Sequence, residues 1–177
     1  MHAHSLARVL AATVLMLLGG LADLQAQTSA GVQAEASALA GEHPSEYYRR
    51  TARLFGDGRK DDAVFMFYLG QLRYRAHLAA RPNQKPDGDP ALFASLQETV
   101  GRPLNEYAFG EIPALARTIE AVLAHDAANP DRFTPPAQFA QAHAGIRDGL
   151  GKMKDQMLRD AESIRATRSK NGLPNRN

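Results

Sequence analysis

The chain has 177 residues, no cysteine and a formal net charge of +2 at pH 7. Without cysteine it can form no disulfide, no thiolate metal site and no thiol nucleophile. The small excess of base is far from the clustered positive charge that nucleic-acid-binding proteins carry, so we expect no nucleic-acid partner.

The first segment has the organisation of a secretory signal peptide. Arg8 ends a short basic start, residues 9–22 are apolar or small, and small Ala26 precedes the expected cleavage point. The apolar run is shorter than the roughly 20 residues that a membrane-spanning helix needs, which favours cleavage over a retained anchor. We therefore expect a signal peptide over residues 1–26 and an exported protein, periplasmic or extracellular, with no stable membrane anchor after cleavage.

The rest of the chain suits a single domain. Residues 27–42 are small and polar without an apolar period, which predicts a flexible lead-in with at most a frayed helix. The folded domain is expected over residues 43–170, followed by a C-terminal tail at 171–177.

Helical patterns dominate this domain, and no segment shows the sustained alternation of a strand. The fold class is therefore predicted as all-α: one bundle-like domain of about five helices with a long C-terminal helix. The helical patterns lie within residues 43–58, 59–82, 89–100 and 113–128, and from near Pro136 to about Arg168.

The third pattern has a defined start and stop. Asp89 is expected to cap it, with Pro90 at the first helical position and Gly101 at the end. Asp87 and Asp89 also stand two apart, as at the start of a calcium loop. No further ligands follow, so helix capping explains Asp89 better.

The last helix carries a heptad-like apolar seam. The seam covers about three heptads, which favours a helix packed within its own bundle over a coiled-coil dimer. Its positions are Phe139, Ile146, Leu150, Met153, Met157 and Ile164.

The second pattern changes character along its length. Residues 63–69 place bulky apolar side chains on nearly all sides of one helix, which predicts a central core helix. Polar residues follow, and Gln71 and Arg75 share one face.

Two arginines of this helix allow two interpretations. Arg73 and Arg75 can pair with acidic residues of neighbouring helices, such as Glu106 or Glu111, and order the interior, which is the interpretation we favour. Alternatively they belong to a polar patch that binds a carboxylate or the acidic surface of a partner.

The segment 104–113 adds Glu106, Tyr107 and Glu111 between two helices. Such connections carry function more often than helix interiors do. The simpler interpretation is a helix–helix corner in which Tyr107 and Phe109 fill the core. These three residues, with Gln71, Arg73 and Arg75, are the candidate binding residues.

Motifs for catalysis and cofactors are not found. The chain has no His-Glu-x-x-His, no Gly-x-Ser-x-Gly and no glycine loop for phosphate. We expect no catalytic residue, no metal and no cofactor, because scattered histidines are usually surface or core residues; those after the signal peptide are His43, His77, His125 and His143. An envelope hydrolase would need a glutamate as its catalytic acid. The candidates for it match by residue type alone; they are Glu98, Glu106, Glu111 and Glu120.

Residues 46–76 read as two helices joined by a tight turn. Ala52 precedes Gly58, and Ala63 and the aromatic pair Phe67-Tyr68 follow it. The segment resembles one repeat of the tetratricopeptide or Sel1-like kind. No second copy follows at the period that such repeats need, so no solenoid is expected. The resemblance implies a helical hairpin and slightly favours a protein-binding role.

Two functions remain open. The first is an exported, non-enzymatic helical protein that binds another protein, for which an inhibitor or immunity-type protein would fit. The alternative is an envelope hydrolase or small-ligand-binding protein with its site between helix 61–80 and loop 104–113, where Arg75, Glu106 and Glu111 would converge.

Overall fold

The computed structural model describes residues 30–176. These residues are all-helical and include no strand, as the sequence patterns predict. No helix within them is long and apolar enough to cross a membrane. The expected signal peptide, residues 1–26, lies outside the described residues.

Seven α-helices follow the helical residues 30–38 and a short 3-10 turn, Leu39–Gly41. The number exceeds the expected five because the segment 104–113 contains part of a helix and the last expected helix divides in two. The helices are α2 (Ser45–Gly56), α3 (Lys60–Ala80), α4 (Asp89–Leu96), α5 (Arg102–Ala108), α6 (Ile112–Ala128), α7 (Ala140–Arg159) and α8 (Ala161–Lys170).

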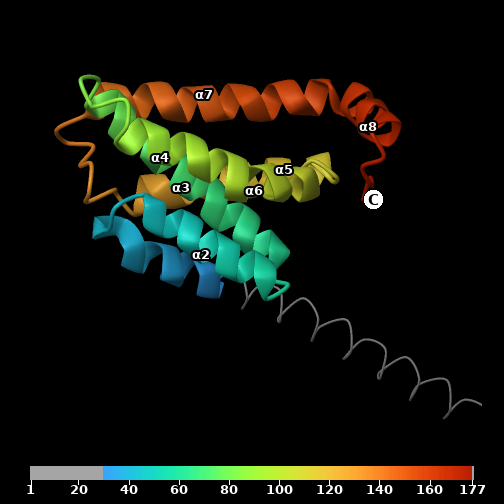
Figure 1. Cartoon of the computed structure of the whole chain (residues 1–177), viewed down its shortest axis with the longest axis horizontal. Helices are drawn as coiled ribbons and strands as arrows, with labels where there is room; N and C mark the ends of the chain where they lie inside the picture. Colours follow the sequence, from blue (N-terminus) through green and yellow to red (C-terminus); the bar gives the residue numbers. More distant parts are fainter. Residues whose placement is uncertain (1–29, 177) are drawn as a thin grey trace, which may run out of the picture.

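Helix α3 is the centre of the bundle. It contacts α2 on one side and α6 and α7 on others, and α6 also packs on α7 (Figure 1). Residues 63–69 are all buried, which confirms the predicted core stretch. Along residues 63–69 the helix has no solvent-facing side, so apolar residues around its whole circumference are stable there.

Helices α2 and α3 form a hairpin with a short turn at residues 57–59. Gly58 has a φ of 81°, in the left-handed region that glycine adopts without steric cost. Gly70 permits close packing of the two helices, because a Cβ at this position would overlap the Cβ of Tyr47. The hairpin has the two-helix form that the resemblance implies; a relation to tetratricopeptide or Sel1-like repeats stays a prediction.

The segment expected to be a flexible lead-in is instead packed on the domain. Residues 30–38 are helical, and Val32 and Ala36 belong to the core. The hydroxyl of Tyr47 donates to the carbonyl of Ala36 at 3.2 Å. Val32, Ala36 and Ala40 recur every four residues, so small side chains conceal an apolar helical face that fits a close contact.

Helix α4 starts where expected but ends differently. Pro90 stands in its first turn as predicted, whereas the N-cap is Gly88 and no side chain caps the helix. Gly101 does not end the helix, because a π-helical turn, Gln97–Gly101, leads directly into α5. A Cβ at Gly101 would lie 3.1 Å from the ring of Phe67, so this glycine serves packing on α3.

The single C-terminal helix expected from Pro136 to Arg168 is wrong in its bounds. Helix α7 ends at Arg159, Asp160 has φ −94° and ψ 9°, and α8 turns away from the axis of α7 (Figure 1). A guanidinium nitrogen of Arg168 donates to the carbonyls of Glu106 and Pro174, at 2.8 and 2.7 Å. These contacts hold α8 against α5, which a straight helix could not reach.

The apolar seam packs within the bundle except at Phe139, whose ring lies 5.2 Å from the Arg81 guanidinium. Leu150 and Met157 are buried, and Ile146, Met153 and Ile164 are partly buried against the same core. The C-terminal tail also packs on the domain, since the amide of Arg176 donates to the carbonyl of Gly110 at 2.7 Å.

Four tyrosines lie in the core with their hydroxyls shielded from water. Burial raises the pKa of Tyr47 to about 12, although Arg73 beside it opposes the shift. Burial raises the pKa of the other three still further; these are Tyr48, Tyr68 and Tyr74.

The raised tyrosine pKa values predict alkaline unfolding. The unfolded chain ionises its tyrosines at about pH 10, whereas the folded chain keeps these hydroxyls protonated. The free energy of unfolding is therefore undiminished below pH 10 and falls as the pH rises toward 12 and beyond. Tyrosinate absorbance should rise together with the loss of helical circular dichroism. Ionisation of all tyrosines with helicity intact would contradict this expectation.

Candidate functional site

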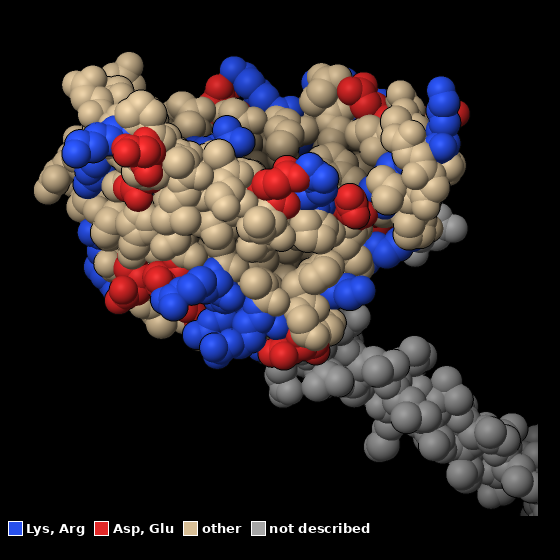
Figure 2. All heavy atoms as spheres, viewed as in Figure 1, with Lys and Arg blue, Asp and Glu red and all other residues tan. Residues whose placement is uncertain are grey.

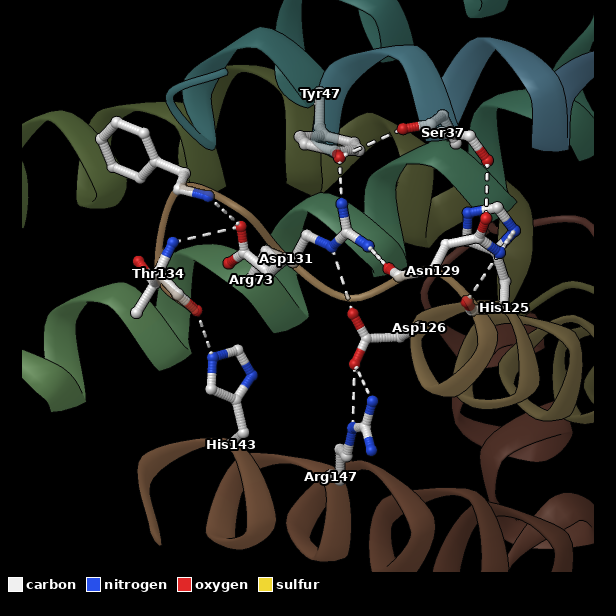
Figure 3. A network of polar contacts seen from close by, with 12 residues as sticks. Ser37, Tyr47, Arg73, His125, Asp126, Asn129, Asp131, Thr134, His143 and Arg147 are labelled. Atoms are coloured by element: carbon white, nitrogen blue, oxygen red, sulfur yellow. Dashed lines mark hydrogen bonds and ion pairs between the residues drawn. The ribbon is translucent and has the colours of Figure 1, made fainter. Parts of the chain in front are cut away.

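Arg73, the first of the candidate residues, lies in the core and not at a binding surface. Its exposed fraction is 0 %. Nε donates to Asp126 at 3.1 Å, one terminal nitrogen donates to the carbonyl of Asn129 at 2.6 Å, and the other donates to the hydroxyl of Tyr47 (Figure 3). The guanidinium also lies over the Tyr47 ring. The charged guanidinium of Arg73 is thus paired inside the fold and is not available to a binding partner.

Asp126 joins two arginines from different helices. It is 1 % exposed, and its second carboxylate oxygen accepts two hydrogen bonds from Arg147, from Nε at 2.8 Å and from a terminal nitrogen at 2.6 Å (Figure 3). Arg147 belongs to α7 and Arg73 to α3. The carboxylate from α6 therefore connects three helices.

The sequence predicts that Arg73 pairs with an acidic residue such as Glu106 or Glu111. In the structure Arg73 pairs with Asp126 instead. Helix α5 packs against the first half of α3, where the hydroxyl of Tyr107 donates to Asp61 at 2.9 Å. At 1.5 Å per residue, Asp61 is about 18 Å from Arg73 along the helix axis. The end of α6 is the acidic element that reaches Arg73.

Gln71 and Arg75 line a groove between α3 and α7. The groove has a volume of about 250 Å³. Arg75 is exposed, and its guanidinium lies 5.5 Å from the ring centre of Phe93. It makes no ion pair with a carboxylate of residues 30–176. The other lining residues are Leu72, Ile146, Gly149, Leu150 and Met153.

Gln71 is fixed by a chain of side-chain amides. Its Nε2 donates to Gln97 at 3.0 Å, and Nε2 of Gln97 donates to the hydroxyl of Tyr48 at 2.6 Å. The side-chain amide nitrogens of Gln71 and Gln97 are therefore already paired, whereas the Arg75 guanidinium makes no hydrogen bond or ion pair with a side chain of residues 30–176.

Helix α7 carries glycines that its own fold does not require. A Cβ added at Gly145, Gly149 or Gly151 would meet no atom within 4 Å. A glycine inside a helix costs about 0.5–1 kcal/mol relative to alanine. Gly149 lines the groove, so its missing side chain leaves the groove open. Glycines inside a predicted helix are visible in the sequence and could have drawn attention to this surface of α7. The candidate residues did not include them.

The remaining candidate residues lie elsewhere. Glu106 is exposed at a second groove of about 520 Å³ between α5 and α8. The Tyr107 ring packs between Phe55 and the guanidinium of Arg176, which lies 3.5 Å from the ring centre. Glu111 is the N-cap residue of α6. The structure thus divides the candidate residues among separate places, and no hydrogen bond or ion pair within the described chain joins Arg75, Glu106 and Glu111.

A further group of ionisable side chains lies at the other end of α3. In residues 30–176 it is the one group of three or more histidines and carboxylates that could share a metal ion, and it consists of His43, His77 and Asp89. Sequence spacing gave no indication of it, because its members are far apart in the chain.

Comparison with protein-family models, curated proteins and solved structures found no match. The functional proposal therefore depends on the geometry of the chain itself.

The Arg73 network predicts unequal effects of two arginine substitutions. Arg73→Met should lower the free energy of unfolding by about 3–5 kcal/mol, because it removes one partner of a buried ion pair. Arg147→Met should cost about 1 kcal/mol, since Arg147 is 33 % exposed and Asp126 keeps Arg73. Urea unfolding of both variants measures the difference, and equal losses would count against the central place of Arg73.

Proposed function

We propose that this chain is an exported helical protein that acts by binding another protein, with the groove between α3 and α7 as the docking site. The observation that carries the proposal is an open apolar groove beside an arginine that has no acidic partner in the described chain. An inhibitor or immunity-type role fits a small protein of this kind.

The size of the groove favours a side chain of a partner over a whole small ligand. Pockets for drug-sized ligands and cofactors hold about 300–1,000 Å³, and this groove holds about 250 Å³. Ile146, Leu150 and Met153 make an apolar floor that suits one anchoring apolar side chain. Methionine adapts to the shape of a bound group, which helps such a contact.

Arg75 supplies the polar part of the contact. Its stacking on Phe93 holds the planar guanidinium at the edge of the groove. Its fork of donors matches a carboxylate with two parallel hydrogen bonds. The partner segment that suits this site therefore carries an apolar anchor with an aspartate or glutamate next to it.

Charges of both signs are distributed over the visible surface (Figure 2). Figure 2 shows basic and acidic side chains interspersed over one face of the molecule. Recognition through one groove and one local ion pair agrees with this distribution better than recognition through a broad charged surface.

The hydrolase or small-ligand alternative lacks its expected constellation. That alternative requires Arg75, Glu106 and Glu111 to converge in one cleft. In the structure Arg75 and Glu106 line different grooves. Protein binding is therefore the function that the geometry supports best.

A charge reversal tests the docking site. The wild-type chain should capture a specific protein from periplasmic extract at low and moderate salt, and Arg75→Glu should reduce capture at least tenfold because it repels the partner's carboxylate. Arg53→Glu is the matched control on α2, which lies on the side of the bundle away from α7 (Figure 1); it should leave capture unchanged. Equal capture by all three chains would refute the groove as the docking site.

A groove-filling substitution gives an independent test with opposite signs for stability and binding. Gly149→Leu should raise the free energy of unfolding by about 0.5–1 kcal/mol, because leucine is a better helix former, and should abolish capture by filling the groove. Gly151→Leu should give the same stabilisation and retain capture, since Gly151 does not line the groove. Loss of capture in both variants, or in neither, would contradict the assignment.

A further inference from the structure

His43, His77 and Asp89 meet at the end of the bundle where α2 begins, α3 ends and α4 begins (Figure 1). The Asp89 carboxylate lies between the two imidazoles. Its Oδ2 is 2.8 Å from Nε2 of His77, and its Oδ1 is 3.3 Å from Nε2 of His43. Asp89 therefore faces the two histidines instead of capping α4.

We propose that these three side chains bind a divalent first-row transition-metal ion such as Zn²⁺. Two imidazole nitrogens and one carboxylate oxygen form a donor set that suits zinc and its neighbours and does not suit Mg²⁺ or Ca²⁺, which prefer oxygen ligands. The proposal is independent of the docking groove.

The distances fit one shared ion. Zinc binds nitrogen and oxygen at about 2.0–2.2 Å, so two ligand atoms on a tetrahedral ion stand roughly 3.3 Å apart. One donor atom from each of His43, His77 and Asp89 lies within 4.8 Å of the other two. The imidazole nitrogens are 2.8 Å from Oδ2 (His77) and 3.3 Å from Oδ1 (His43) of the carboxylate. Small rotations of side chains would bring the three atoms onto one ion.

Rigid surroundings position the ligands. His77 is buried at the end of α3, and the His43 ring packs edge-on against Tyr74 and Phe133. The hydroxyl of Tyr74 donates to the backbone carbonyl of Asp89 at 3.3 Å. The ligand side chains are therefore already held in place, so binding an ion costs little of their conformational entropy.

The site is open to solvent on one side. The side chains of His43 and Asp89 are 28 % and 30 % exposed, whereas His77 is 5 % exposed. An ion held by three protein ligands keeps a further coordination position for water or an incoming group, as in catalytic zinc sites and unlike closed structural ones.

Hydroxyl groups stand behind both imidazoles. Nδ1 of His43 is 2.8 Å from the hydroxyl of Ser45, and Nδ1 of His77 is 3.3 Å from the hydroxyl of Thr134. An imidazole that binds metal through Nε2 carries its proton on Nδ1 and needs an acceptor there. The Thr134 hydroxyl can accept the proton of His77. The Ser45 hydroxyl can accept that of His43, whose Nδ1 in this conformation accepts the backbone N–H of Ser45 at 3.3 Å.

Arg81 opposes metal binding in this conformation. A terminal nitrogen of its guanidinium donates to Nδ1 of His77 at 2.7 Å and lies 3.2 Å from the Thr134 hydroxyl. Nδ1 is then an acceptor, and the His77 proton sits on Nε2, where it is donated to Asp89. Metal binding moves that proton to Nδ1 and displaces the guanidinium. Arg81 thus competes with the metal ion for His77, and its removal should strengthen binding.

Titration calorimetry with Zn²⁺ tests the proposal on the chain purified without a histidine tag and with His2 and His4 replaced by alanine. One Zn²⁺ should bind per chain, and neither Mg²⁺ nor Ca²⁺ should compete. His43→Ala and Asp89→Asn should each weaken binding at least about tenfold. Asp87→Asn, at an exposed aspartate two residues before Asp89, is the matched control and should leave the affinity unchanged.

Arg81→Gln separates a built site from adventitious zinc. It should tighten binding about tenfold, because the competing hydrogen bond to His77 is lost, and X-ray absorption should report nitrogen and oxygen ligands at about 2.0–2.2 Å. Circular dichroism confirms that each variant is folded; His43, being partly exposed, is the ligand whose loss the fold tolerates best. Absence of zinc binding, or equal affinity in wild type, His43→Ala and Asp89→Asn, would overturn the proposal.

Discussion

The buried pair of Arg73 and Asp126 is the constraint on which the arrangement of the helices depends. A charge removed from water must be paired and hydrogen-bonded, since leaving it alone costs several kcal/mol. Arg73 is fully buried, so Asp126 on α6, Tyr47 on α2 and the carbonyl of Asn129 must all reach it. Apolar contacts tolerate small slips between helices, but this set of hydrogen bonds does not. The network therefore fixes how α2, α3 and α6 are aligned.

The same network sets the position of the docking groove. Arg147 binds the second oxygen of Asp126, which holds α7 at the level of Arg73 along α3. The neighbouring turns of α7, residues 146–153, consequently lie opposite Gln71 and Arg75. A surface site is thus placed by a contact in the interior. The second half of α3 supplies residues to the core network, to the groove and to the histidine cluster, because its faces meet different neighbours.

Aromatic and basic side chains pack together at the end of the bundle that lies away from the histidine cluster. Arg176 stacks on Tyr107, and Arg168 donates to carbonyls of α5 and of the tail. The bend at Asp160 lets α8 make these contacts, so the C-terminal residues act as part of the fold. Tyr107 lies partly buried at the corner between α5 and α6, packed against the edge of the core.

The sequence by itself determined the helical class, the central position of residues 63–69 and the apolar seam of α7, because each of these depends on a local period of side chains. It missed the packed helix at residues 30–38, where alanines conceal the apolar face, and the bend at Asp160, which depends on contacts with α5. Only the tertiary structure decided that Arg73 pairs with Asp126, that Arg75 faces a groove, and that His43, His77 and Asp89 meet. Those residues are far apart in the chain, and their encounter is set by how helices pack, which no local pattern encodes.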